Sequence, residues 1–366
     1  MDRRKRALKL GERLVVKDNI DCVALTSPPS LRYFFNYRGE SFERFCCGLF
    51  SKDGSKSALI VPRLDRAKAE KSTADMVSTW TDSEGYSGAF TSAVKDLGVG
   101  TKIVGAELSI TMAQMDSFRS TLGTSNFVGI TEEISGLRMI KGAEEIESIR
   151  KTARILSSAF RNVKESLRPG KQESEVALEI RKFLANHGAK EVDFCAVQSG
   201  KNSAIPHAQA SRKEMEKGDM VVLDISCTNG EGYFADFTRT FVIGKASERQ
   251  KQVYSMVKEA QYAGCKAAMA GSSVQDVDRA ARSVIRNAGY GDYFFHRTGH
   301  GLGLEVHEPP WIMEGNEHEL ERGMVFTVEP GIYLPGRFGV RIEDNLIVGK
   351  RMATNITLLS HELIET

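Results

Sequence analysis

The sequence lacks three features that would point to particular classes of protein. No apolar run approaches the roughly 20 residues that a membrane-spanning helix needs. The 366 residues carry a formal net charge of only +2, which gives no reason to expect a nucleic acid or a strongly acidic partner. The six cysteines have no C-x-x-C spacing and lie in apolar surroundings. We therefore expect reduced thiols in a cytoplasmic, globular protein that binds neither nucleic acid nor membrane.

The basic N-terminus, M-D-R-R-K-R-A-L-K-L, also lacks something. It has no apolar core of the kind found in signal peptides, because Gly11, Glu12 and Arg13 follow directly. We expect the solvated face of a short amphipathic helix here, rather than a targeting or phosphate-binding arm.

The length suits two domains better than one. Short apolar runs in the first third predict strands at 22–26, 48–51, 58–62 and 102–106. Helices are predicted at 63–71 and 111–121, and Ser27–Pro29 predicts a turn. Strands that alternate with helices indicate a small α/β domain over residues 1–130. We expect it to serve dimerisation or to cover a substrate cleft.

Residues 131–366 contain an internal repeat, in which two helices are followed by strands. Three positions recur at a constant offset of 101 (271 − 170): Gly170, Val176 and Gly188 match Gly271, Val277 and Gly289. The strand K-G-D-M-V-V-L-D ends at Asp224, and its counterpart R-G-M-V-F-T-V-E ends at Glu329, an offset of 105 (329 − 224). Two copies are too few for a solenoid, so we expect one domain with pseudo-twofold symmetry.

Carboxylates occupy the ends of these repeated strands. Asp224 ends one strand, and Asp236 lies in the returning strand after a turn signal at 228–230. A hairpin would bring the two side chains together, and buried like charges repel strongly unless cations lie between them. For this segment alone there is an alternative, in which one aspartate pairs with Arg239 and the other caps a turn.

The second copy adds His300, Glu329 and Glu343 in the motifs T-G-H-G-L-G-L-E-V-H-E, T-V-E-P-G-I-Y and V-R-I-E-D. Four carboxylates and one imidazole suit Mn²⁺, Co²⁺, Fe²⁺ or Zn²⁺ in a two-metal site. A structural zinc site would instead use sulfur or several histidines. Arg341 lies two residues before Glu343, so on a strand it would share that residue's face and orient an acidic ligand.

These motifs resemble those of the pita-bread metallopeptidases, which include methionine aminopeptidase, aminopeptidase P and prolidase (Xaa-Pro dipeptidase). The first 130 residues are similar to the N-terminal domain of prolidase and aminopeptidase P, which methionine aminopeptidases lack. The resemblance implies an α+β, pita-bread catalytic domain over residues 131–366. It implies five metal ligands at the matching positions Asp224, Asp236, His300, Glu329 and Glu343.

The resemblance further implies a binuclear hydrolase that cleaves Xaa-Pro bonds at the N-termini of small peptides. Mn²⁺ or Co²⁺ are the favoured metals, and a homodimer is expected. Asp236 and Glu343 would bridge the metals, and Glu329 would shuttle a proton. His207, in the motif S-A-I-P-H-A, and His307 would bind the substrate's carbonyl oxygen.

Proline specificity requires a pocket shaped for the ring, because an Xaa-Pro amide has no N–H for backbone recognition. We expect Trp311 or Tyr333 to line that pocket. Prolidases often carry an arginine shortly after the H-E dipeptide, where it can hold the substrate's carboxylate, but Pro310 and Trp311 stand in that region here. This departure argues against strict dipeptide specificity.

Two further departures concern the first strand pair. The aspartates are one residue further apart than is usual in the family, and Ser226 stands where glycine is common. The main alternative to a prolidase is aminopeptidase P activity on longer peptides. A non-catalytic peptide-binding protein and a creatinase-like hydrolase are disfavoured, because both usually lack these metal ligands.

Overall fold

The computed structural model describes residues 3–15, 20–39, 43–123 and 126–366. The chain forms two compact units, Met1–Arg138 and Met139–Thr366. The boundary expected after residue 130 lies at the start of α6 (Thr131–Met139), one helix before this division. No helix in the described part of the chain is long and apolar enough to cross a membrane.

The first unit is built on a six-stranded sheet in the order β4-β3-β2-β1-β5-β6. The four predicted strands are present as β1 (Cys22–Leu25), β2 (Cys47–Ser51), β3 (Ser57–Pro62) and β5 (Val104–Ala106). The two edge strands were not predicted: β4 (Met76–Trp80) and β6 (Phe127–Gly129). Edge strands are only partly buried, so their sequences show no continuous apolar run.

The helices that precede α6 in this unit are α1 (Arg3–Val15), α2 (Pro28–Phe35), α3 (Arg66–Ala69), α4 (Ser87–Leu97) and α5 (Met112–Leu122). The turn predicted at Ser27–Pro29 is wrong, because these residues begin α2. Ser27 caps the helix by accepting a hydrogen bond from the Ser30 backbone N–H at 3.3 Å. Proline is tolerated in the first helical turn, where backbone N–H groups have no partner within the helix.

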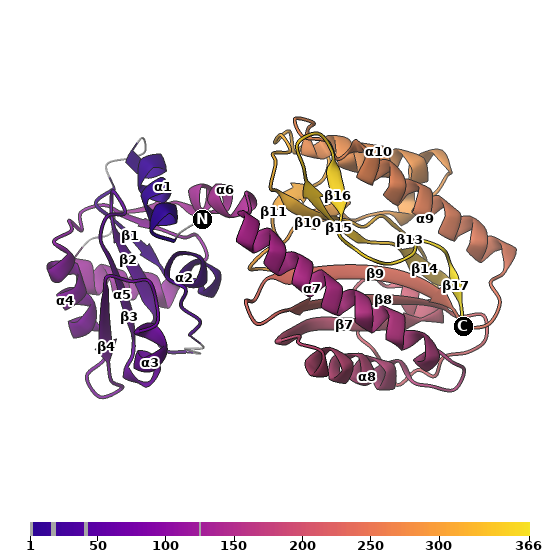
Figure 1. Cartoon of the computed structure of the whole chain (residues 1–366), viewed down its shortest axis with the longest axis horizontal. Coiled ribbons are helices and arrows are strands. Elements are labelled where there is room, and N and C mark those ends of the chain that lie inside the picture. The colour runs from indigo at the N-terminus through magenta and orange to yellow at the C-terminus, as the bar shows by residue number, and fades with distance from the viewer. Residues whose placement is uncertain (1–2, 16–19, 40–42, 124–125) are drawn as a thin grey trace. The chain divides into compact units, whose positions relative to one another are not determined.

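The repeat predicted for the second unit is present (Figure 1). The helices α7 (Ala143–Asn162) and α9 (Glu248–Ala267) are both 20 residues long. Their partners α8 (Glu173–Asn186) and α10 (Val274–Asn287) are both 14 residues long. The four glycines that flank α8 and α10 all have positive φ, which glycine adopts without strain: Gly170, Gly188, Gly271 and Gly289.

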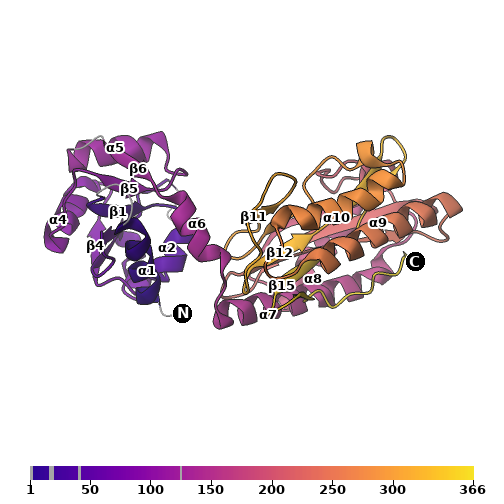
Figure 2. The same ribbon diagram turned by 90° about the horizontal axis from the view of Figure 1, so that it is seen from above.

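Two sheets and a hairpin connect these helices. One sheet has the order β17-β9-β8-β7, with β7 (Glu191–Ser199), β8 (Met220–Thr228), β9 (Phe234–Val242) and β17 (Ile364–Glu365). The other has the order β11-β10-β12-β15-β16, with β10 (Gly299–Gly301), β11 (Glu308–Ile312), β12 (Val325–Val328), β15 (Asp344–Val348) and β16 (Ala353–Asn355). A separate hairpin joins β13 (Gly331–Leu334) to β14 (Phe338–Arg341). Figures 1 and 2 show α9 and α10 side by side, and in Figure 1 α7 crosses β8 and β9.

Two glycines in the G-H-G motif allow β10 to fit between β11 and β12. A Cβ atom on Gly299 would lie 1.9 Å from the carbonyl oxygen of Thr327, and one on Gly301 would lie 2.3 Å from that of Pro309. Any side chain at either position would therefore push the strands apart. The glycines let the backbone carry His300 between two close neighbours.

A buried ion pair joins the start of α7 to β11. The Lys141 ammonium lies 2.7 Å from the Glu308 carboxylate, and the two side chains are only 2% and 3% exposed. Lys141 precedes α7, and Glu308 directly follows His307 in the chain. The pair thus fixes the loop that carries His307 against the beginning of the second unit.

We predict that Glu308→Gln lowers the free energy of unfolding of the second unit by about 3–5 kcal/mol, because it leaves a buried lysine without its counter-charge. Chemical denaturation followed by circular dichroism measures this. The matched control is Glu147→Gln, which removes one partner of the exposed Arg154–Glu147 pair and should leave the midpoint unchanged. Equal effects of the two substitutions would contradict the prediction.

Candidate active site

The hairpin of β8 and β9 places Asp224 and Asp236 on one face of the sheet. Asp224 lies opposite Thr238, and Asp236 lies opposite Ser226, so the aspartates are diagonal neighbours across the ladder. The predicted approach of the two carboxylates is confirmed by this register. The alternative ion pair with Arg239 is wrong, because Arg239 pairs with Asp344 at 2.6 Å.

Glu329 and Glu343 come from the second copy of the repeat. We expected both to lie on strands, but neither does. Glu329 directly follows β12, and Glu343 lies between β14 and β15. The β13–β14 hairpin leaves the sheet between them, and the pairing of Val328 with Asp344 brings their neighbours together again. Both carboxylates therefore extend from the ends of strands, where the Glu329 N–H donates to the Thr298 carbonyl oxygen and the Glu343 N–H to that of Thr238.

Arg341 is the last residue of β14, so Glu343 lies outside this strand. The expectation that the two residues share one strand face is therefore wrong. Its guanidinium forms an ion pair with Asp224 and donates a hydrogen bond of 2.9 Å to the Tyr333 hydroxyl. Arg341 thus contacts an acidic residue of the site, but one from the other half of the repeat.

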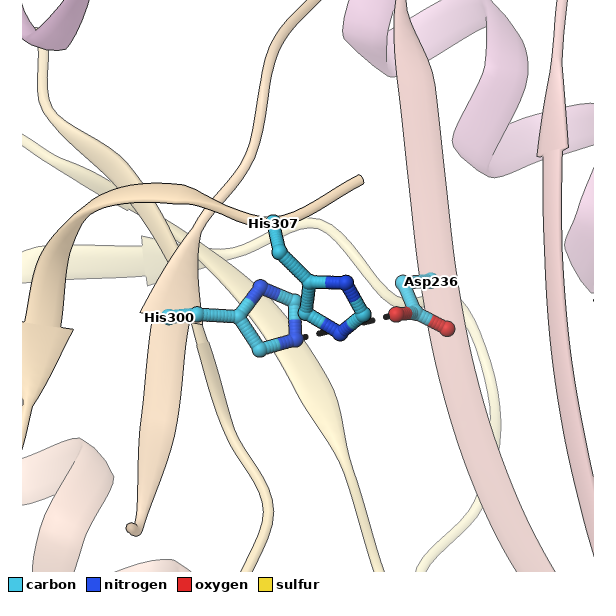
Figure 3. Close-up of side chains that lie close together, drawn as sticks. All are labelled: Asp236, His300 and His307. Carbon is cyan, nitrogen blue, oxygen red and sulfur yellow. Dashed lines mark ion pairs between the residues drawn. The ribbon is translucent and has the colours of Figure 1, made fainter. Parts of the chain in front are cut away.

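His300 connects the two sets of carboxylates. Its Nε2 atom lies 3.4 Å from Glu329 Oε1 and 3.8 Å from Asp236 Oδ2. Its Nδ1 atom lies 3.1 Å from the carbonyl oxygen of Gly301, which favours a proton on Nδ1 and leaves Nε2 free as a ligand. Figure 3 shows the His307 ring beside that of His300, with the ring centroids 4.2 Å apart, and the Asp236 carboxylate beyond them.

These side chains form three overlapping groups whose potential ligand atoms lie within 4.8 Å of one another. The groups are Asp224–Asp236–Glu343, His300–Glu329–Glu343 and Asp236–His300–His307. Together they include all five ligands expected from the sequence. His307, expected beside the substrate, also lies within reach of a metal.

Three carboxylate oxygens in this site are buried without a hydrogen-bond partner: Asp224 Oδ1, Asp236 Oδ1 and Glu343 Oε1. An unpaired buried carboxylate oxygen is costly, since nothing replaces its hydration. Oxygen-rich donors with one or two imidazoles match the preferences of divalent transition metals. The residues present therefore fit a site for divalent cations.

The crowding of negative charge has a direct effect on proton affinity. Burial and the neighbouring carboxylates raise the pKa values of Asp236 and Glu343 well above the usual range. Burial, together with the charge of Asp224, raises the pKa of Glu329 to about 7. Burial lowers the pKa of His300 to about 3, so this imidazole is neutral and able to bind a metal at neutral pH.

The site opens into a cavity of about 870 Å³. The five expected ligands, Arg341, His207 and His307 all line it. Gln198 holds the His207 loop by donating hydrogen bonds of 3.0 and 2.9 Å to the carbonyl oxygens of Pro206 and Ala208, one on each side of the histidine.

Trp311 and Tyr333 are not among the residues that line this cavity. Tyr333 is buried behind it, where its hydroxyl lies 3.0 Å from His296 Nε2. Trp311 lies on β11 beneath Arg297, whose Cζ atom is 4.3 Å from the centroid of the indole ring. Their expected role as the wall of a proline pocket remains a prediction.

The lining includes residues that no sequence pattern singled out, notably Phe295 and Arg297. They directly precede the T-G-H-G motif, and their nearness in sequence to His300 was the signal that could have revealed them. Apolar side chains complete the wall, and two of them, Ile205 and Phe295, are more than half exposed.

Comparison with known proteins agrees with this geometry. Residues 147–350 match the metallopeptidase family M24, and residues 6–140 match the creatinase/prolidase N-terminal domain. The probable dipeptidase PepE of Mycobacterium tuberculosis is 36% identical over 98% of this chain and 96% of its own length. The Xaa-Pro dipeptidase of Pyrococcus furiosus is 34% identical over 98% of this chain and 100% of its own.

Solved structures show the same relationship. The prolidase from Thermococcus sibiricus superimposes with a TM-score of 0.93 at 34% identity, with 100% of both chains covered. The α+β, pita-bread fold expected from the sequence is thereby confirmed. The family match spans 204 of the 366 residues (350 − 147 + 1). This chain is a metallopeptidase that belongs to family M24 and carries a creatinase/prolidase N-terminal domain.

Proposed function

We propose that this protein is an Xaa-Pro dipeptidase that uses two divalent metal ions. One observation carries the proposal: three carboxylates from both halves of the repeat come together, and each has a buried oxygen without a hydrogen-bond partner. The names of the relatives add support, since the Xaa-Pro dipeptidase of Pyrococcus furiosus matches along the whole of its length.

Five residues would hold the metals. Asp224 and Asp236 from the first half of the repeat, and His300, Glu329 and Glu343 from the second, would supply their ligand atoms. When bound, the ions would supply the Lewis acidity that activates a water molecule and polarises the scissile carbonyl. We propose Mn²⁺ or Co²⁺ as the native metal, and the donor set is also compatible with Zn²⁺ or Fe²⁺.

Neighbouring side chains hold these carboxylates in place. The Thr238 hydroxyl donates a hydrogen bond of 2.7 Å to Glu343 Oε2, which directs the other oxygen toward the cavity. Arg341 holds one oxygen of Asp224 in the same way. The Asn345 side chain accepts from the Asp236 N–H at 3.2 Å and donates to its carbonyl oxygen at 2.7 Å, which fixes the backbone on which that carboxylate stands.

Three residues would handle protons and charge during hydrolysis. Glu329 lines the cavity beside the other carboxylates, where it can accept a proton from the attacking water and pass it to the proline nitrogen that leaves. His207 and His307 line the cavity beside the metal ligands, where each can donate a hydrogen bond to the carbonyl oxygen as negative charge develops on it.

We further propose that the protein acts as a cytoplasmic homodimer. The six cysteines are all free, and five of them are buried, which suits a reducing compartment. Burial raises the pKa values of several of these thiols, including Cys195 and Cys227, to about 12, so they are chemically inert.

Aminopeptidase P activity on longer peptides is the second candidate function. The X-Pro aminopeptidase from Thermotoga maritima superimposes with a TM-score of 0.88 at 34% identity, with 100% of both chains covered. The two candidates differ in the group that the proline carbonyl carries, a free carboxylate or a further peptide bond. The chemistry of the bond that is cleaved is the same in both.

The first prediction concerns peptide length. The Mn²⁺- or Co²⁺-loaded protein should release proline from Ala-Pro and should act much more slowly on Ala-Pro-Ala. Amino-acid analysis of the products at matched substrate concentrations measures both rates. Cleavage of the tripeptide alone would identify an aminopeptidase P, and hydrolysis of neither would contradict both candidates.

The second prediction concerns the metal ligands. Asp236→Asn should bind fewer than two metal ions per chain and reduce hydrolysis of Ala-Pro by at least about 100-fold, because a neutral amide is a weaker donor to a divalent cation than the carboxylate that it replaces. Elemental analysis of the purified variant measures the metal content independently of activity. Asp292→Asn is the control, since Asp292 is exposed and lies outside the cavity lining. Full metal content and activity in Asp236→Asn would refute the assignment.

The third prediction concerns pH. The pKa of Glu329 is raised in the folded, metal-free protein to about 7, so the folded state binds more protons than the unfolded state above the ordinary carboxyl pKa. Glu329 by itself should therefore contribute a loss of stability of about 3 kcal/mol as the pH rises from about 4.5 to 7, whereas His300, whose pKa is lowered to about 3, contributes in the opposite direction over most of this range. Equilibrium unfolding across this range tests the sign. The difference in unfolding free energy between wild type and Glu329→Gln isolates the contribution of Glu329 and should fall as the pH rises; a difference that rises with pH would be incompatible with this account.

A further inference from the structure

Two arginines line the catalytic cavity, and they differ in what neutralises them. Arg341 is committed to Asp224 and to the Tyr333 hydroxyl. The Arg297 side chain forms neither an ion pair nor a hydrogen bond with any residue in the described ranges. Its guanidinium group instead packs on the indole ring of Trp311, with Cζ 4.3 Å from the ring centroid. Arg297 thus brings to the wall of the cavity a positive charge that no salt bridge in the described ranges neutralises, although the Glu329 carboxylate acts on it through space.

The Trp311 ring gives this charge a fixed position relative to the proposed metal ligands. Trp311 on β11 is the register partner of His300 on β10. The Asn316 side chain also donates a hydrogen bond of 2.7 Å to the Trp311 carbonyl oxygen. Arg297 lies three residues before His300 (300 − 297), and its charge acts on both His300 and Glu329. The ladder that positions the ligand His300 therefore also positions the platform under Arg297.

Packing on an aromatic ring leaves the hydrogen-bonding capacity of an arginine available. A guanidinium group contacts a ring through its face, whereas its five N–H donors point outward in its plane. Arg297 is partly buried, so its donors are not fully surrounded by bulk water. A planar, always charged fork with free donors matches a carboxylate better than any neutral group.

We infer that Arg297, supported by Trp311, binds the C-terminal carboxylate of a dipeptide and so selects dipeptides over longer peptides. This rests on the proposed function, in which the bond before the last residue is cleaved. The carboxylate then belongs to the same residue as the leaving nitrogen. It must therefore lie within about one residue length of the scissile bond, where consecutive Cα atoms are about 3.8 Å apart, and so close to the proposed metal ligands. In a longer peptide a neutral amide occupies this place and offers no charge to Arg297.

The position of Arg297 also bears on whether the H-E-P-P-W segment argues against dipeptide specificity. The absence of an arginine there counted against dipeptide specificity. In the folded protein, Trp311 stands in that region and holds, at the cavity wall, an arginine from the segment that leads into β10. The positive charge comes from a different part of the chain, and the tryptophan supplies its support.

The test compares Ala-Pro with Ala-Pro-amide, which differ only in the terminal charge. Wild type should prefer the free carboxylate. Arg297→Met should lower kcat/KM for Ala-Pro by about 10- to 100-fold, mainly through KM, and change it less than about threefold for the amide. Trp311→Leu should give a smaller loss of the same kind, and Trp311→Phe should restore most of it because a ring is retained.

The matched control is Arg249→Met. Arg249 also packs on an aromatic ring, with its Cζ 5.3 Å from the centroid of Tyr290, but it does not line the cavity, so both substrates should behave as in wild type. Thermal midpoints and metal content, measured for every variant, separate loss of recognition from loss of folding or of the metal site.

The inference is overturned if Arg297→Met, folded and metal-loaded, slows both substrates equally, or if wild type hydrolyses the amide as fast as the acid. In both results the wild-type enzyme still cleaves Xaa-Pro bonds, so the proposed function stands. If metal-loaded wild type cleaves neither substrate, the proposed function fails, and the inference is overturned with it.

Discussion

Electrostatic repulsion among buried carboxylates is the constraint on which the catalytic unit depends. Asp224, Asp236, Glu329 and Glu343 come from four separate points in the chain and meet in one cavity. Burial and, after it, their mutual charges raise the pKa values of three of them, and three of their oxygens have no hydrogen-bond partner. Such a cluster persists only if something positively charged compensates for it. The cluster therefore destabilises the metal-free protein and favours the binding of cations.

The surrounding structure holds this unfavourable cluster in place with ion pairs between neighbouring buried charges. Directly behind Glu343, Asp344 pairs with Arg239 at 2.6 Å, and the same guanidinium donates to the Glu343 carbonyl oxygen. Lys141 pairs with Glu308 next to His307, and Arg341 pairs with Asp224. Buried pairs of this kind add little net stability, but breaking one is costly, so they hold the backbone in a single arrangement. The proposed metal ligands therefore extend from backbone segments that these ion pairs hold in place.

The repeat and most of the candidate site could be predicted, because both depend on residue types and spacings that are local in the sequence. The helices of the repeat follow from apolar periodicity, and the offset of 105 residues linked Asp224 to Glu329 before any contact was known. The diagonal approach of Asp224 and Asp236 follows from a hairpin. The errors have equally local causes. The edge strands β4 and β6 are too exposed to show an apolar run, and Ser27–Pro29 is a helix start whose prolines resemble a turn.

The sequence by itself determined the identity of the site residues, the repeat and the family, because residue type, spacing and periodicity are properties of the linear chain. Only the tertiary structure decided which partner each charge has. Arg341 contacts Asp224 rather than its neighbour Glu343, Arg239 contacts Asp344, and Arg297 rests on Trp311 instead of a carboxylate. Ion pairs act over a few ångströms through space, and sequence separation does not encode that distance. The position of the Arg297 guanidinium at the cavity wall depends on the pairing of β10 with β11, which brings Trp311 beneath it.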